Sequence, residues 1–103
     1  MKQAVAEPYG VPVAFVKSRK GWSTLTGEPP PDGAVGVCQW ASGLLVIGWF
    51  DRRAQTLCHE CVHAGLAILE YVGIDPRDSQ GEALAYLTDW LFGQGFSPAS
   101  RPA

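Results

Sequence analysis

Apolar and polar positions alternate over short stretches in the first half of the chain. Runs rich in β-branched and aromatic residues predict three strands, at residues 11–17, 34–40 and 44–50. Pro12 favours an edge position for the first of these. Ala41-Ser42-Gly43 separates the other two strands and predicts a three-residue hairpin loop, with Gly43 at the position that needs a positive φ.

The second half of the chain changes to longer apolar stretches, which predict two helices. Residues 57–72 are almost all apolar or small, and a helix that is apolar nearly all round is a buried helix. Asp51 is a candidate cap for it. After the breaker Asp75-Pro76, residues 79–92 predict a second helix, capped by Asp78 or Ser79. The short connection makes the two helices antiparallel or steeply crossing neighbours.

This order of elements predicts an α+β fold, with a small antiparallel sheet of about three strands packed on two helices. A chain of 103 residues predicts a single domain over residues 1–103. We expect residues 1–10 and 95–103 to be flexible, and residues 18–21 and 27–33 to form a turn and a stiff loop.

Composition narrows the functional classes. A hydrophobic content of 47% with 17% charged residues is typical of a globular protein. The net charge of −2 argues against nucleic-acid binding through a basic surface. No apolar run is long enough for a membrane span, and no signal peptide is evident at the N-terminus. Three cysteines in apolar surroundings fit a reducing compartment, so we expect a cytoplasmic protein.

The long helix contains an H-E-x-x-H motif, His59-Glu60-Cys61-Val62-His63, which includes both histidines of the chain. Positions i and i+4 share one helix face, so the two imidazoles can reach one metal ion. Glu60 points beside the metal, where a base can take a proton from a metal-bound water. The polar side chains form a narrow stripe on a helix expected to be buried, and such groups are costly unless paired or liganded.

Glu82 is the candidate third ligand. It lies in the first turns of the second helix, from which it could reach back to the face that carries His59 and His63. Two histidines and one carboxylate, with a fourth position for water, are the ligands of a catalytic zinc (Zn2+) rather than of a closed structural site.

The motif with Glu82 about twenty residues later resembles the gluzincin metallopeptidases, especially their minimal single-domain members, and small phage- or prophage-encoded H-E-x-x-H proteins. The resemblance covers about residues 43–92 and implies a zincin-like minimal domain. It implies zinc held by His59, His63 and Glu82, with Glu60 as the general base.

The resemblance also raises two questions about the site. Larger gluzincins often place an aspartate four residues after the glutamate ligand to orient a histidine, but that position is Tyr86 here. The orienting role would pass to Asp89, Glu70 or a backbone carbonyl. In gluzincin-like sites an edge strand holds the peptide, and that strand is either residues 44–50 or residues 35–40 here.

The cysteines and the aromatic residues also bear on the hypothesis of a metal site. Cys58 and Cys61 lie on a different face from the histidines and are interpreted as small buried hydrophobes rather than as a redox pair. Tyr86 is a candidate catalytic residue that could donate a hydrogen bond to a developing oxyanion, although helix packing explains it equally well. One or two of the four tryptophans could line a substrate cleft.

The leading hypothesis is a zinc-dependent hydrolase, most simply a small metallopeptidase acting on a peptide or protein substrate, with Glu60 and Tyr86 catalytic. The alternative is a non-enzymatic metal-binding domain, such as a phage structural or assembly component, which uses the same ligands to join two helices. A third reading is an accidental motif without metal. In the phage case the protein would work in the host cytoplasm, without membrane or nucleic-acid partners.

Overall fold

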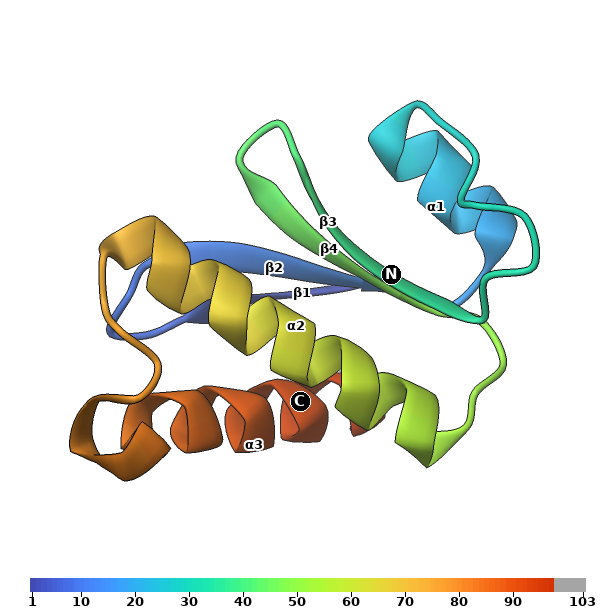
Figure 1. The fold of residues 1–103 in the computed structure, drawn as a ribbon. Helices are drawn as coiled ribbons and strands as arrows, with labels where there is room; N and C mark the ends of the chain where they lie inside the picture. The colour runs from blue at the N-terminus through green and yellow to red at the C-terminus, as the bar shows by residue number, and fades with distance from the viewer. Residues whose placement is uncertain (98–103) are drawn as a thin grey trace, which may run out of the picture.

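The computed structural model describes residues 1–97 of the chain (Figure 1). Along the chain the elements are β1 (Lys2–Ala6), β2 (Val11–Val16), α1 (Arg19–Thr26), β3 (Gly36–Ala41), β4 (Leu44–Trp49), α2 (Ala54–Val72), the 3-10 turn η1 (Asp78–Gly81) and α3 (Glu82–Phe96). The fold is α+β, as the sequence predicts, but the described residues form four strands and three α-helices rather than three strands and two helices.

The sheet is mixed, with strand order β1-β2-β4-β3. β1 pairs antiparallel with β2, and β3 pairs antiparallel with β4, but β2 and β4 are parallel. The prediction of a purely antiparallel sheet is therefore wrong. The two hairpins meet through parallel strands because α1 and β3 lie between β2 and β4 in the chain and return it to the same end of the sheet.

Two elements lie where the sequence suggests irregular structure. β1 occupies the N-terminal segment that we expected to be flexible, and its five residues pair with β2 from Lys2–Phe15 to Ala6–Val11. α1 replaces most of the turn expected at residues 18–21, whereas the loop expected at residues 27–33 has no helix or strand. The Ser18 hydroxyl accepts a hydrogen bond from the Gly21 N–H at 3.0 Å, and Gly27 ends the helix with a φ of 83°.

Residues with positive φ form the β3–β4 turn and end helix α2. The β3–β4 loop is shorter than predicted: Ala41 pairs with Leu44, and both Ser42 and Gly43 have positive φ, as a two-residue type I′ turn requires. α2 ends at Gly73, whose N–H bonds the Glu70 carbonyl while the Ile74 N–H bonds that of Leu69. These two bonds satisfy carbonyl groups left free at the helix end.

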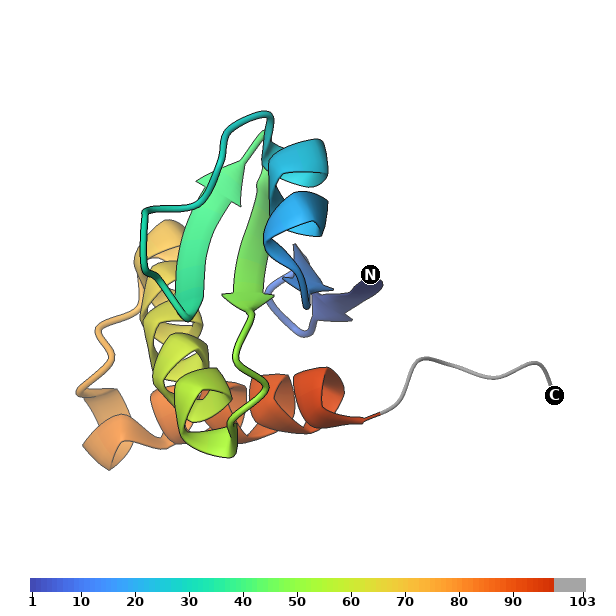
Figure 2. The same cartoon turned by 90° about the vertical axis from the view of Figure 1, so that its right-hand side faces the viewer.

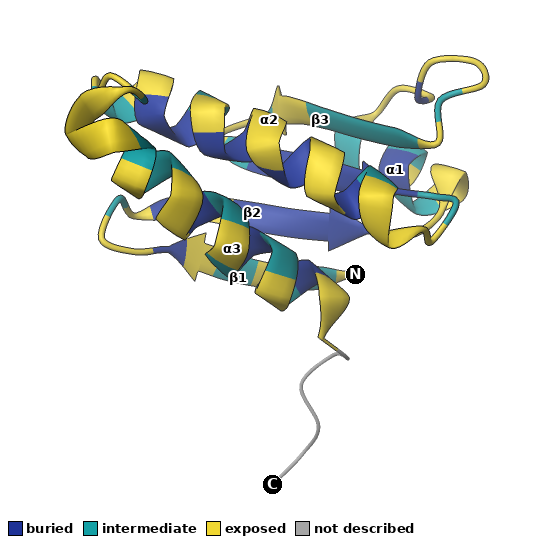
Figure 3. Ribbon diagram, turned by 60° about the horizontal axis from the view of Figure 1, so that its bottom comes forward, coloured by how far each residue is buried: buried dark blue, intermediate teal, exposed yellow. Residues whose placement is uncertain are grey.

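Helices cover both faces of the sheet. Figures 1 and 2 show α2 and α3 side by side on one face and α1 on the other. The larger core lies between the sheet and the helix pair, and its members include Phe15, Ile47, Leu57, Ile68 and Leu91. A smaller core is centred on Val16, Trp22 and Val46 beneath α1. Burial colouring in Figure 3 shows the consequence for α2, which turns one buried stripe inward and one exposed stripe outward.

Among the helices of residues 1–97, each is too short or too polar to cross a lipid bilayer.

Candidate functional site

His59 and His63 lie on the exposed side of α2, and their Nε2 atoms are 3.1 Å apart. Tetrahedral zinc with Zn–N bonds of about 2.1 Å would separate two such nitrogen atoms by about 3.4 Å. The same distance also allows a hydrogen bond between two neutral rings, one donating and one accepting. The two Nε2 atoms are thus within hydrogen-bonding distance and slightly closer than a shared zinc would hold them.

Glu60 lies between the histidines and the sheet. Only 8% of its surface is exposed, and among residues 1–97 it is the one charged residue that is buried. Burial raises the pKa of its carboxyl group, whereas the nearby His59 and His63 act in the opposite direction. A carboxylate in this position is more basic than one in water and therefore better suited to accept a proton.

Gly36, the first residue of β3, lets the strand approach this carboxylate closely. A Cβ atom placed on Gly36 would lie 2.7 Å from Thr56 Cγ2, 3.0 Å from Glu60 Cγ and 3.1 Å from Glu60 Oε2. Any side chain here would push Glu60 or the strand aside. The sequence analysis did not single out Gly36, because nothing in the order of residues shows which strand passes over the helix.

A cleft of about 500 Å³ opens where β3 begins beside the first turns of α2, and its lining includes Gly36, Asp51, His59 and Glu60. Asp51 stabilises one side of the cleft through two hydrogen bonds. Its Oδ1 accepts one from the Arg53 N–H at 3.0 Å, and its Oδ2 accepts one from the Thr56 hydroxyl at 2.8 Å. Asp51 was predicted to cap the helix directly, but the N-cap position belongs to Arg53.

The loop that leads into β3 is also anchored. The Arg19 guanidinium donates to the carbonyl groups of Pro30, Pro31 and Ala34, at 3.2, 2.9 and 2.8 Å. The same group lies 5.6 Å from the centroid of the Phe50 ring. These contacts fix the loop just before Val35 and Gly36, which both line the cleft.

β3 is the strand at the open edge beside this cleft. The sheet order places β4 in the interior, between β2 and β3, and leaves the outer side of β3 without a strand partner among the described residues. Of the two candidate segments, residues 44–50 fall on the interior strand β4, and residues 35–40 fall on the edge strand β3. The Phe50 N–H bonds the Val35 carbonyl, so by alternation the backbone groups of Gly36, Cys38 and Trp40 point to the free side.

Glu82 is not brought to the histidines. α3 packs on the side of α2 that carries Gly65, since a Cβ there would lie 3.0 Å from Leu84 Cδ1. At about 100° per residue, Gly65 is about 120° from His59 and about 160° from His63 around the helix. Within residues 1–97, no three His, Cys, Asp or Glu side chains are grouped so that they could hold a metal.

The segment before Glu82 explains its placement. Ser79, Gln80 and Gly81 have φ of 53°, 60° and 82° in succession, and α3 starts directly after them. A left-handed conformation costs a non-glycine residue about 1–2 kcal/mol. The position of Glu82 thus depends on a strained turn rather than on a regular helix start.

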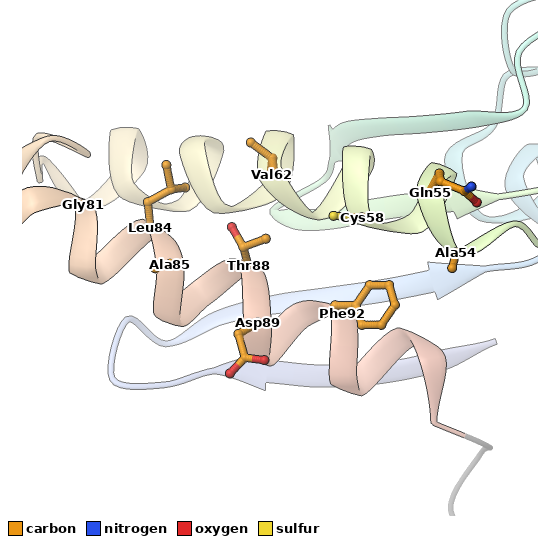
Figure 4. Close-up of a pocket in the computed structure, with 10 residues that line it drawn as sticks. All are labelled: Ala54, Gln55, Cys58, Val62, Gly81, Leu84, Ala85, Thr88, Asp89 and Phe92. Atoms are coloured by element: carbon orange, nitrogen blue, oxygen red, sulfur yellow. The ribbon is translucent and has the colours of Figure 1, made fainter.

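The other residues considered for the site lie elsewhere. Tyr86 is on α3, and its hydroxyl is 3.4 Å from the Glu7 carbonyl, next to β1 at the opposite edge of the sheet. Asp89 lines a groove of about 690 Å³ between α2 and α3, shown in Figure 4 with Cys58 and Val62. Glu70 is exposed on α2, and no described carboxylate hydrogen-bonds either imidazole.

The three cysteines differ in how far they are buried. Cys61 is buried and Cys38 is half-buried, and burial raises the pKa of each thiol to about 12, which keeps both protonated and unreactive. Cys58 differs from the prediction of a buried hydrophobe, because it is exposed in the groove between α2 and α3. Of the tryptophans, Trp22 and Trp49 belong to the two cores and Trp40 is exposed.

We found no match between this chain and any known protein family, curated protein or solved structure.

Proposed function

We propose that the protein is a zinc-dependent hydrolase of zincin-like type that cleaves peptide bonds. The observation that carries the proposal is the pair of Nε2 atoms 3.1 Å apart, next to a cleft that is lined by His59 and the buried carboxylate of Glu60. The likeness of the motif to the gluzincin metallopeptidases supports the same reaction class. An open edge strand beside the cleft supports a peptide as the substrate.

The residues fit zinc in part. His59 and His63 supply two nitrogen ligands with their Nε2 atoms 3.1 Å apart, but Glu82 lies on another side of α2 in this structure. The described residues bring no third His, Cys, Asp or Glu side chain to this pair. A zinc ion bound there would polarise a carbonyl group and lower the pKa of a bound water.

The roles of the chain's own residues follow from their positions. Glu60 accepts a proton from the attacking water and returns it to the leaving amine, and its raised pKa helps it to hold that proton between the two steps. β3 binds the peptide backbone through its outward N–H and carbonyl groups and presents it to the cleft. Tyr86 has no role in this proposal, because its hydroxyl lies beside Glu7.

A non-enzymatic metal-binding domain, of the kind used in phage structure or assembly, is the second candidate. The separation of Glu82 from the histidines favours it, because a two-histidine site can bind metal without the full ligand set of a hydrolase. In that case Glu60 would serve only to hold the histidines or the strand in place.

Zinc content and peptide hydrolysis, measured on the same preparations, separate these candidates. Wild-type protein should hold about one zinc per chain by plasma mass spectrometry, and His59→Ala and His63→Ala should lose it. Glu60→Gln should keep the zinc and the fold but lose hydrolysis by about 10²-fold or more. Glu70→Gln, an exposed glutamate on the same helix, is the matched control and should keep both properties.

Three results would count against the proposal in different ways. Absence of zinc from the wild-type protein, even after incubation with the metal, would exclude a zinc site. Zinc without hydrolysis of a mixed peptide library would favour the second candidate. Unchanged zinc affinity in Glu82→Gln would exclude Glu82 as the third ligand while leaving the histidine pair in place.

A further inference from the structure

A groove of about 690 Å³ runs between α2 and α3 on the side of the helix pair that faces solvent (Figure 4), and it is here called the helix groove. Its lining includes Cys58 and Val62 from α2 and Ala85 and Phe92 from α3. On the side of α3 the lining extends from Gly81 to Phe92, a length of about 16 Å or three helical turns. The groove therefore has the length of a short helix laid along it.

Large apolar side chains are exposed along this groove. Val62 and Leu66 are each 38% exposed, and their spacing of four residues places them on one face of α2. Phe96 is 57% exposed and stacks on Phe92 of the groove, with ring centroids 5.3 Å apart. A helix that covers a sheet usually turns polar and charged side chains to water on its outer face. The outer faces of α2 and α3 depart from this pattern in the way that protein-binding surfaces do.

The charges around the groove are acidic. Neither α2 nor α3 contains a lysine or an arginine. Glu70 lies one turn after Leu66 on the same face of α2, and Asp89 is the one charged residue in the lining of the groove. Glu82 is seven residues before Asp89 and points within about 20° of the same direction. All three carboxylates are exposed and none belongs to an ion pair within residues 1–97, so the groove suits a basic partner.

This negative charge is concentrated toward one end of the groove. Glu70 and Glu82 lie where the chain passes from α2 to α3. Arg77 lies in the same connection, but its charge is balanced by Asp75 at 3.0 Å. At the opposite end, residues 52–53, both arginines, precede the first residue of α2. A bound helix is therefore expected to carry its basic residues near the connection between α2 and α3.

Three other occupants fit these features less well. An extended strand would find no free backbone groups to pair with, because those of α2 and α3 are used within the helices, whereas a bound helix satisfies its own. A second copy of the helix pair would bring the same carboxylates against these ones. An anionic lipid surface or a nucleic acid would meet the same repulsion.

We propose that the helix groove binds a basic amphipathic α-helix of a partner protein. Apolar side chains of that helix, spaced at i, i+3 or i+4 and i+7, lie between Val62 and Phe92, and lysine or arginine side chains beside them face Glu70 and Asp89. The interaction goes beyond the proposed function and does not depend on it, because neither histidine nor Glu60 lines the groove.

Binding of three synthetic peptides of about 18 residues to the full-length chain tests this proposal. The first has leucines on one face of a helix and lysines beside them. The second has glutamate in place of each lysine, and the third has the composition of the first in an order without an apolar face. Fluorescence anisotropy at pH 7.5 and low salt should show the first peptide bound at least about tenfold more tightly than the other two. Equal affinity for the first and second peptides, or no binding of the first, would overturn the proposal.

Charge reversal at the rim of the groove tests the acidic contribution. Asp89→Lys should weaken binding of the lysine peptide about fivefold and strengthen binding of the glutamate peptide. Asp32→Lys makes the same change of charge in the loop before β3 and is the matched control, which should alter both affinities less than about twofold. Equal effects of the two variants would contradict a role for the charge beside the groove.

Ala85→Arg tests the groove itself. Ala85 is exposed and lines the groove, so an arginine there would occupy it and repel a basic helix. Binding of the lysine peptide should fall about tenfold or more, and circular dichroism should show that the variant is folded. Unchanged binding in this folded variant would overturn the proposal.

Two further measurements decide where the peptide binds and whether a second copy takes its place. Amide NMR shifts caused by the lysine peptide should centre on Val62, Ala85 and Phe92, and shifts confined to β3 or α1 would overturn the groove as the site. Sedimentation of the peptide-free chain should give the same mass for the wild type and Ala85→Arg. A dimer that dissociates in Ala85→Arg would assign the groove to a second copy and overturn the proposal. None of these measurements requires zinc or hydrolysis, so the groove and the hydrolase proposal are tested separately.

Discussion

Glu60 lies on α2, next to Gly36 of the edge strand β3, and lines the cleft. The H-E-x-x-H spacing predicted that it would lie beside the two imidazoles, because helix geometry alone fixes that relation. Its burial and its contact with Gly36 could not be predicted, since they depend on which strand crosses the helix. The sequence thus supplies the local chemistry of the site, and the tertiary fold supplies its surroundings.

Gly36→Ala tests how closely the strand and this carboxylate are packed. The added methyl group would meet Thr56 at 2.7 Å and Glu60 at 3.0 Å, so we expect a loss of about 1–3 kcal/mol in the free energy of unfolding. Displacement of Glu60 should also reduce hydrolysis. Urea denaturation and a peptide assay on the same variant measure the two effects.

Gly93→Ala is the control for this substitution. Gly93 lies in α3, and a Cβ there would meet nothing within 4 Å, so alanine should stabilise the helix by about 0.5–1 kcal/mol. Equal effects of the two alanines on stability would contradict the close approach at Gly36.

At the scale of elements, the strong periodic segments were predicted and the weak ones were not. The sequence predicts β2, β3, β4 and α2 to within a few residues, because their apolar runs are long. β1 and α1 were missed. β1 has only five residues and gains its structure from pairing with β2, and α1 has only eight residues, of which Trp22 is the buried one.

The position of Glu82, the candidate third ligand, could not be predicted for a similar reason. A short connection predicted that α3 would lie beside α2, but not which side of α2 it would cover. The small side chain at Gly65 admits α3 on the side away from the histidines, and this choice depends on packing rather than on spacing. The strands likewise do not reveal the parallel pairing of β2 with β4, because both are apolar on each face.

The start of α2 provides a pH-dependent prediction. Hydrogen bonds from the Arg53 N–H and, to a lesser extent, the Thr56 hydroxyl hold the pKa of Asp51 below its usual value of 3.8. Because the folded protein prefers the charged form, this stabilisation is present above pH 3.8 and is lost as the pH falls through the lower folded pKa. Asp51→Ala should therefore melt below the wild type at pH 6, and the two melting temperatures should converge in acid.

Circular dichroism melting curves between pH 6 and pH 2 measure this difference. Asp32→Ala, an exposed aspartate in the loop before β3, is the control and should follow the wild type at each pH. A gap between Asp51→Ala and wild type that stays constant down to the lowest pH would contradict the assignment.

At the scale of the whole molecule, the two cores and the candidate metal site belong to one packed unit around a single sheet. α2 contributes Leu57, Cys61 and Ile68 to the larger core on one side and carries His59 and His63 on the other. A ligand that binds only the folded state adds its binding free energy to stability. Metal binding on α2 should therefore be visible in the unfolding of the entire chain.

Zinc should raise the melting temperature of the metal-free wild-type protein. At a free zinc concentration 100 times the Kd, the gain is about 2.7 kcal/mol. For a domain of this size that corresponds to a shift of about 10 °C or more. Differential scanning calorimetry with and without zinc measures it. His63→Ala should show no shift, and an unchanged midpoint in the wild type would contradict metal binding to the folded state.

The open side of β3 has a further consequence for behaviour in concentrated solution. Exposed edge strands usually carry lysine, proline or a bulge that keeps other chains from adding to the sheet and starting aggregates. Residues 36–41 contain none of these charged or proline side chains, and the regular pairing with β4 shows no bulge. An edge left open for the proposed peptide substrate would also be open to a second copy of the chain, so solubility and binding of that substrate would be opposing demands on the same six residues.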